Sequence, residues 1–220
     1  QLAERFSISR EEQDEFAAAS HLKAAAAWDA GLYPEVIAVP GTDLVRDEGI
    51  RADATTASLG ALKPAFRPDG SVTAGNSSPI NDGASMLFIG AEDALDAEPL
   101  ARIIGRGAFG NDPNTFGIAP VEAANRALAR AGKTWADVDL VELNEAFAVQ
   151  SLACLKLWPE LDPAKLNVHG GAIAIGHPLG ASGGRIIGHL AHELRRRGGG
   201  VGVAAICIGV GQGLAVVLER

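Results

Sequence analysis

The chain has 220 residues and a formal net charge of −8, and its 47% hydrophobic content is enough for a packed core. Residues 1–100 hold 17 acidic and 7 basic residues, which argues against nonspecific nucleic-acid binding, because such binding depends on neutralising phosphates. The sequence has no run of about 18 apolar residues, so it predicts no membrane span. Two cysteines are too few for a secreted disulfide framework, and we expect a globular cytoplasmic protein.

The first part of the chain begins with one strong helix signal and then becomes irregular. Ser9 and Glu12 form a capping-box pattern ahead of an Ala-rich stretch, which predicts a helix over 10–30 that Gly31 ends. Residues 32–69 are rich in Pro and Gly and predict loops, although 35–39 is compatible with a short strand. A cluster of turn formers over 71–84 is then followed by the apolar run 84–89, which has the length of a buried strand.

The second part of the chain alternates strands with helices. Apolar runs predict strands over 101–104, 139–143, 201–206 and 214–218. Helices are expected over 120–132, 144–158 and 182–197, the last with an apolar face. This alternation predicts an α/β fold with a mostly parallel sheet, covered by helices on both faces and closed by an antiparallel hairpin.

Three turns in this second part carry residues with chemical potential. Asn144 follows one strand, His177 lies in a glycine-rich loop before a helix, and Cys207 ends another strand. Each has an ordinary alternative: Asn144 as a helix N-cap, His177 as an exposed loop residue, and Cys207 as an inert small apolar residue. We expect each of the three residues to lie at the carboxyl end of its own strand. Because parallel sheets place ligands there, the three turns could instead converge on one pocket with thiol acid/base chemistry.

The motifs at these turns resemble the three C-terminal signatures of the thiolases. They are the Asn-Glu-Ala-Phe-Ala segment 144–148, the Gly-Gly-Ala-Ile-Ala-Ile-Gly-His-Pro-Leu-Gly-Ala-Ser-Gly segment 170–183, and the Cys-Ile-Gly-Val-Gly segment 207–211. Residues 73–84 are similar to the turn of that family that contacts coenzyme A, and 62–66 to the segment before it. The resemblance covers essentially the whole chain and implies a thiolase-like fold.

The resemblance also implies roles for individual residues. His177 would activate a nucleophilic cysteine that takes the acyl group, and Cys207 would move the α-proton of acetyl-CoA. His177, with a water held by Asn144, would stabilise the enolate oxygen, and the N–H of Gly209 would help to hold the thioester oxyanion. The substrate-binding positions, beside the pantetheine arm or in the turn that contacts coenzyme A, would be Ser78, Phe147, Ala74 and Gly75.

The sequence departs from the family pattern in one important respect. The nucleophilic cysteine belongs to the N-terminal half of a thiolase, and neither Cys154 nor Cys207 lies in its motif. We therefore expect the C-terminal part of a thiolase, with 1–75 as the end of the loop insertion, 76–98 as the tail of the first domain and 99–220 as the second domain. Gln1 in place of Met agrees with a chain that begins inside a longer gene product.

The expected function is acyl transfer between a 3-ketoacyl-CoA and CoA, with coenzyme A as substrate, no cofactor and no metal. Expected partners are acyl-CoA and CoA, the N-terminal half with the nucleophile, and further copies in a homo-oligomer, but neither nucleic acid nor membrane. The isolated chain is expected to be inactive. Two alternatives remain: a noncatalytic CoA-binding or scaffold module, or a ketoacyl-synthase-like enzyme, which would need a second His where this chain has Asn144 and Cys207. Phe116, where many thiolases have Met, leaves the acyl-chain preference open.

Overall fold

The computed structural model describes residues 1–92, 94 and 97–220. The expected segment 76–98 therefore includes three residues, 93, 95 and 96, that lie outside the described part of the chain. The helices are α1 (Leu2–Arg5), α2 (Arg10–Asp29), α3 (Thr56–Gly60), η1 (Pro113–Ile118), α4 (Ala119–Ala131), η2 (Trp135–Asp137), α5 (Ala148–Leu157), η3 (Pro163–Lys165), α6 (Ala172–Ile175) and α7 (Ser182–Arg197). The strands are β1 (Arg102–Gly110), β2 (Leu140–Leu143), β3 (Val201–Ile208) and β4 (Gln212–Glu219).

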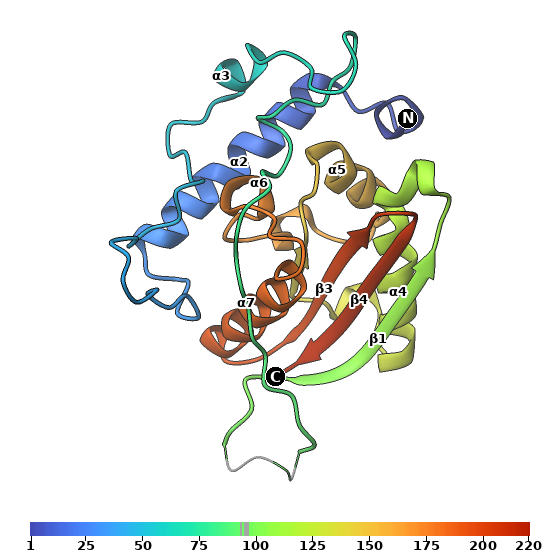
Figure 1. The fold of residues 1–220 in the computed structure, drawn as a ribbon. Helices are drawn as coiled ribbons and strands as arrows, with labels where there is room; N and C mark the ends of the chain where they lie inside the picture. The colour runs from blue at the N-terminus through green and yellow to red at the C-terminus, as the bar shows by residue number, and fades with distance from the viewer. Residues whose placement is uncertain (93, 95–96) are drawn as a thin grey trace.

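The strands form one mixed sheet in the order β1-β4-β3-β2 (Figure 1). The α/β class and the closing hairpin β3–β4 are confirmed, but the expectation of a mostly parallel sheet is wrong. Only β2 and β3 pair in parallel, while β4 pairs antiparallel with both β3 and β1. The turn 209–211 is too short for a crossover, so β4 must return antiparallel to β3, and β1 then adds to its free edge.

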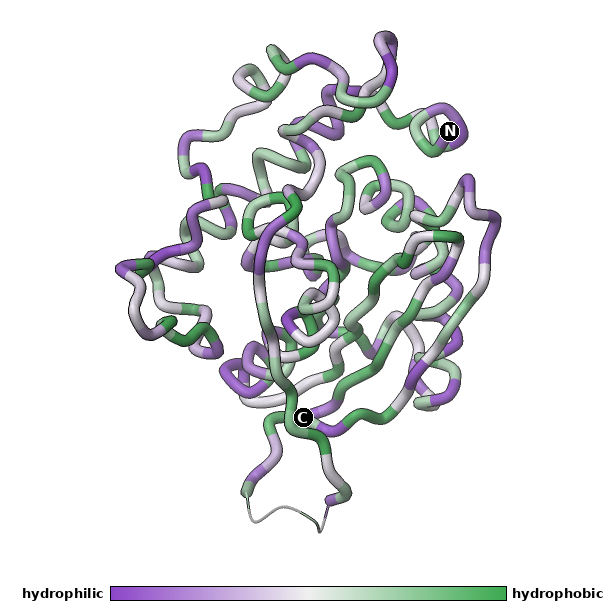
Figure 2. Tube along the Cα trace, in the orientation of Figure 1, coloured by the Kyte–Doolittle hydropathy of each residue, from purple (hydrophilic) through white to green (hydrophobic). Residues whose placement is uncertain are grey.

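Two helices cover opposite faces of the sheet, and the strand residues alternate between them. Val203, Ala205 and Val217 lie in the buried cluster on the α4 side, whereas Ala204 and Leu218 pack with α7. This period of two is the one that a pleated strand imposes. Figure 2 shows β3 and β4 as largely hydrophobic, because both faces of these strands are covered by helices.

The first part of the chain lies along one side of this sheet domain (Figure 1). Helix α2 begins at the predicted capping box, in which the Ser9 hydroxyl accepts from the N–H of Glu12 and the Glu12 carboxylate accepts from the N–H of Ser9. No helix among the described residues is long and apolar enough to cross a membrane.

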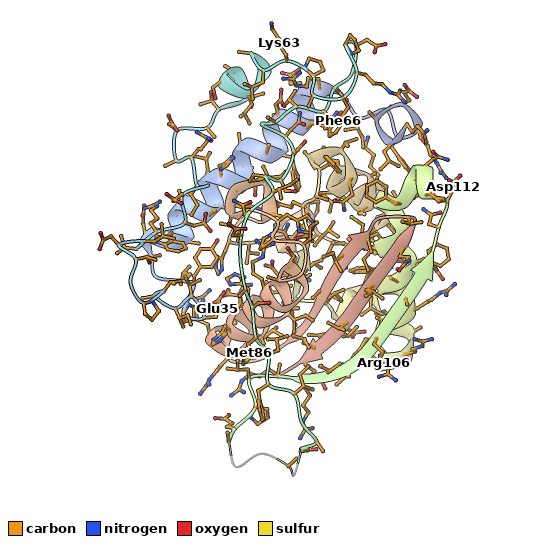
Figure 3. The ribbon with its side chains drawn as sticks, viewed as in Figure 1. Glu35, Lys63, Phe66, Met86, Arg106 and Asp112 are labelled. Atoms are coloured by element: carbon orange, nitrogen blue, oxygen red, sulfur yellow. The ribbon has the colours of Figure 1, made fainter. Side chains whose placement is uncertain are left out.

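Two expected strands in this part are absent, since neither 35–39 nor 84–89 forms a strand among the described residues. The second is an extended segment that crosses in front of α6 and α7, where Figure 3 labels Met86. Its apolar side chains are largely exposed, with Met86 at 91% and Phe88 at 81%. The segment has the sequence of a buried strand but no neighbouring strand among the described residues.

Candidate active site

The structure brings Asn144 and His177 into direct contact. Nδ2 of Asn144 lies 3.3 Å from Nε2 of His177, although the two residues are 33 positions apart. Asn144 is fully buried and His177 is half-buried. Two of the three predicted turns therefore meet at one point.

The contacts of His177 fix its tautomer. The amide nitrogen of Asn144 can only donate, so Nε2 accepts and the ring proton lies on Nδ1. Nδ1 donates to the Ser182 hydroxyl at 2.6 Å, and that hydroxyl donates to the carbonyl of Pro178 at 3.1 Å. Burial lowers the pKa of His177, and the positive charge of Arg185 lowers it further. The result is a neutral imidazole with its basic nitrogen turned toward Asn144.

Asn144 is held by its backbone at the end of β2 and does not cap the next helix. Its N–H donates to the carbonyl of Ala205 at 2.9 Å, which continues the β2–β3 pairing. Helix α5 begins only at Ala148, with Phe147 as N-cap and no capping side-chain bond. The helix expected from residue 144 is therefore shorter, and the alternative of Asn144 as a helix cap is wrong because its side chain is used in the His177 contact.

The His177 loop is positioned by α6 and by the extended segment, and no strand leads into it. Gly176, directly before His177, ends α6 at a φ of 84°, a conformation that favours glycine. The N–H of His177 donates to the carbonyl of Pro79 at 3.1 Å, and the Ser85 hydroxyl donates to the carbonyl of Ala181 at 2.7 Å. The expectation that all three turns follow strands is thus wrong for His177, because the short helix α6 occupies that place.

Cys207 lies near the end of β3, beyond Ala205 to which Asn144 is bonded. Its thiol is buried, and burial raises its pKa to about 12, so it is a neutral thiol at pH 7. In the described part of the chain it makes no hydrogen bond to His177 or Asn144, and its strand position faces the α4 side of the sheet, where Cys154 is also buried. The structure therefore brings Cys207 to the neighbouring strand end without a hydrogen bond to the imidazole among the described residues.

Gly209 lies in the exposed turn of the β3–β4 hairpin, and a side chain at this position would meet no atom within 4 Å. The next two residues, Val210 and Gly211, have φ values of 70° and 92°, so the turn is built from left-handed backbone. The backbone of Gly209 is therefore open to a ligand.

The residues expected to bind substrate lie along the side of α5 that faces the first part of the chain. Ser78 donates to the carbonyl of Ala146 through both its N–H and its hydroxyl, at 3.0 and 3.1 Å, which places it beside Phe147. Ala74 is exposed, and the neighbouring Gly75 lies so close to Leu59 and Leu62 that a larger residue would clash.

Phe147 also lines an apolar pocket of about 540 Å³. Phe66, labelled in Figure 3, lines the same pocket and meets Phe147 edge to face, with ring centroids 6.1 Å apart. Phe116 lines it from η1. The pocket is thus suited to a long, mostly apolar ligand arm.

Sequence reasoning missed three polar residues that support the pair. Ser182 fixes the tautomer of His177, as described above. Arg185, in the first turn of α7, donates to Oδ1 of Asn144 at 3.2 Å and to the carbonyl of Gly176 at 3.1 Å. Glu145 is buried and accepts hydrogen bonds from α2 and from the start of α6. Glu145 and Ser182 lie inside the motifs 144–148 and 170–183, and Arg185 lies two residues beyond the second, so only their positions could have drawn attention to them.

Chemically, the Asn144–His177 pair can take up a proton and stabilise negative charge. When Nε2 of His177 accepts a proton, it becomes a donor next to Nδ2 of Asn144, and two donors at one point favour a developing oxyanion. No group of three or more His, Cys, Asp or Glu side chains that could hold a metal ion occurs in residues 1–92, 94 and 97–220.

Comparison with known proteins agrees with this fold. Residues 1–93 match the model of the N-terminal domain of thiolase, and residues 97–220 match that of the C-terminal domain. The chain belongs to the thiolase family.

Individual relatives match it over its whole length. It is 46% identical to the mitochondrial 3-ketoacyl-CoA thiolase of Mus musculus and 48% identical to a probable acetyl-CoA acyltransferase of Staphylococcus aureus, covering 57% and 58% of those proteins. The crystal structure of human mitochondrial 3-ketoacyl-CoA thiolase in complex with CoA superposes with a TM-score of 0.92 at 47% identity, with all of this chain and 57% of that chain covered. The chain thus spans less than two thirds of the length of these relatives.

Proposed function

We propose that this chain forms the C-terminal part of a thiolase active site, which transfers an acyl group between a 3-ketoacyl-CoA and CoA. The observation that carries the proposal is the contact between Asn144 and a neutral His177 whose basic nitrogen faces the amide. The family of the chain and the names of its relatives support the same reaction class.

In the proposed reaction, the nucleophilic cysteine comes from the N-terminal half of the enzyme. Nε2 of His177 takes the proton of that thiol, whose sulfur attacks the 3-keto carbon. The bond between the 2- and 3-carbons then breaks, and its electron pair becomes the enolate of acetyl-CoA, which the protonated His177 and a water on Asn144 stabilise. Cys207 protonates the α-carbon, a role that suits a thiol kept neutral by burial. The resulting Cys207 thiolate takes the proton of the incoming CoA thiol, whose sulfur then takes the acyl group from the nucleophilic cysteine, and that cysteine regains its proton from His177. The N–H of Gly209 helps to hold the thioester oxyanion.

The pantetheine arm of the substrate is proposed to pass Ser78 and Phe147 and to use the pocket that Phe66 and Phe116 also line. Ala74 and Gly75, in the turn where Gly75 packs against Leu59 and Leu62, are proposed to contact the ligand as well. The human thiolase complex supports CoA as the ligand, because that chain was solved with CoA and 57% of it matches the whole of this chain.

The N-terminal half is proposed as a partner because the apolar extended segment over 80–89 has no neighbouring strand among the described residues. Ile80, Met86 and Phe88 are 81% or more exposed. Cys154 is fully buried and its pKa is raised, so it is unsuited to replace the missing nucleophile. We therefore infer that the isolated chain is inactive. Cytoplasmic location and a homo-oligomeric state stay predictions.

The test is to combine this chain with the N-terminal half of a thiolase and to measure cleavage of acetoacetyl-CoA by CoA. Cleavage is expected only when both halves are present. The deuterium exchange of acetyl-CoA tests Cys207 separately: Cys207→Ala should abolish exchange while acylation of the nucleophile continues, and Cys154→Ala serves as the matched control. Exchange at the unaltered rate in Cys207→Ala would refute the assigned role.

A noncatalytic CoA-binding module is the second candidate, and one observation favours it. The apolar pocket of about 540 Å³, which Phe66, Phe116 and Phe147 line, offers a CoA arm an apolar surface on this chain itself. Titration of the chain with CoA, followed by addition of the N-terminal half, separates the two functions: binding without any cleavage supports the module. The match to both thiolase models favours the thiolase function over the ketoacyl-synthase alternative.

A further inference from the structure

The guanidinium of Arg185 joins the two turns of the site. It extends from the first turn of α7 and donates through Nη2 to Oδ1 of Asn144 and through Nη1 to the carbonyl of Gly176, the residue before His177. A planar guanidinium holds its donors in a fixed fork, so the two turns are set relative to each other as well as to α7.

The contact with Arg185 also decides which way the Asn144 amide points. A guanidinium has donors only, so the group that faces it must be the amide oxygen. The NH₂ group of Asn144 then has to face Nε2 of His177, as the 3.3 Å contact requires. If the amide were reversed, its oxygen would face Nε2 and the ring proton would be drawn to that nitrogen, which would remove the base.

Burial of the charged Arg185 guanidinium costs free energy, so its position is expected to serve the site. It lies beside a cavity of about 100 Å³ lined by Tyr33, Glu35, Asp47, Glu142 and His189. Figure 3 labels Glu35 beside α7, where the Glu35 carboxylate accepts from His189 at 2.6 Å. These acidic groups offset the buried positive charge. In the described part of the chain, Nε of Arg185 has no hydrogen-bond partner. The guanidinium therefore makes fewer links within the fold than its donors would allow.

We propose that Arg185 is a positioning residue that fixes the amide of Asn144 and, through it, the basic tautomer of His177. This rests on the function proposed above. The role is distinct from that of Asn144 and His177, because Arg185 acts on the reaction only through its contacts with those two turns.

The test uses two variants in the enzyme reconstituted from this chain and the N-terminal half. Arg185→Lys keeps the charge but loses the fork, and Arg185→Met loses both. We expect kcat to fall about 100-fold in Arg185→Met, and less in Arg185→Lys, with KM for CoA changed less than about threefold, because misplaced catalytic groups affect the reaction more than binding. Arg195→Met, in the exposed last turn of the same helix, is the control and should leave both constants unchanged.

Two further measurements separate positioning from loss of folding. In an Asn144→Ala background, Arg185→Met should have little additional effect, because two residues that act as a unit are not additive. Nitrogen NMR of the labelled 220-residue chain should show the Nδ1–H tautomer of His177 in the unaltered chain and a mixture in Arg185→Met.

The outcomes distinguish this inference from the proposed function. If no reconstituted enzyme is active, the proposed function fails, while the NMR comparison still tests Arg185. An unchanged tautomer, or full additivity with Asn144→Ala, would overturn the positioning role even if the enzyme is active.

Discussion

The interior of the sheet domain is packed through apolar side chains, whereas the boundary between that domain and residues 1–92 combines small apolar clusters with buried polar contacts. Inside the domain, α4 and α7 pack on the sheet through apolar side chains such as Leu128, Val203 and Leu190. At the boundary, buried polar groups meet: Ser20 donates to Glu145 and accepts from the N–H of Gly171. The Asn144–His177 pair lies at this polar boundary. The apolar interior supplies stability, and the boundary supplies the fixed polar contacts that a reactive site requires.

The largest predicted effect concerns the apolar interior. Leu190 is 1% exposed and packs between α7 and the sheet. Leu190→Ala should lower the free energy of unfolding by about 4 kcal/mol, since it removes buried carbon and leaves a cavity. Urea denaturation followed by circular dichroism measures this change. Leu190→Met, which conserves volume, should cost less than about 1.5 kcal/mol. A loss below about 1 kcal/mol in the Ala variant would show that this helix contributes little to the core.

The second prediction removes the main polar contact of the boundary. The buried Glu145 carboxylate accepts from the Ser20 hydroxyl, the Asn167 amide and the N–H of Ile173. Glu145→Ala leaves three buried donors unpaired and should cost about 3 kcal/mol of unfolding free energy. Glu145→Gln, which retains one acceptor oxygen, should lose less, and equal losses in both variants would contradict the hydrogen-bond explanation.

The third prediction concerns pH and the boundary carboxylate Glu142. Burial raises its pKa to about 7, and the groups that face it are Tyr33, Glu35 and Asp47 from the first part of the chain, Arg185 and His189 from α7, and Glu145. An unfolded glutamate has a pKa near 4.5. Between pH 4.5 and 7 the folded chain therefore binds one more proton at Glu142 than the unfolded chain does. Its stability falls as pH rises from about 4.5 to above 7.

Measurement of unfolding free energy at several pH values between 4.5 and 8 tests this sign. The unfolding free energy should decrease progressively across that window, because burial opposes ionisation of the Glu142 carboxyl and keeps its pKa raised in the folded chain. Glu142→Gln should flatten the profile, whereas Glu122→Gln, a partly exposed carboxylate on α4, should not. Parallel profiles for the unaltered chain and Glu142→Gln would rule out Glu142 as the cause.

The sequence predicts the domain interior well and the boundary poorly, for a physical reason. The apolar period of Ile186, Leu190 and Leu194 is local, and α7 forms over the predicted residues. The contacts of Asn144 are tertiary. Its local sequence favours the alternative of a helix N-cap, but its amide is held by residues 33 and 41 positions away. Likewise, the antiparallel pairing of β1 depends on which sheet edge is free, and this has no signal within β1 itself.

The smallest predicted effect on stability concerns the extended segment, whose two sides differ in exposure. Leu87 approaches Gly188 on α7, whereas the next residue, Phe88, is 81% exposed. In the 220-residue chain, Leu87→Ser should cost about 1 kcal/mol of unfolding free energy, and Phe88→Ser less than about 0.5 kcal/mol, because an exposed side chain gives up few contacts. The order should reverse when association with the N-terminal half is measured by titration calorimetry, where Phe88→Ser weakens binding about tenfold. If Phe88→Ser binds as tightly as the unaltered chain, the exposed side of this segment is not the surface that receives the missing half.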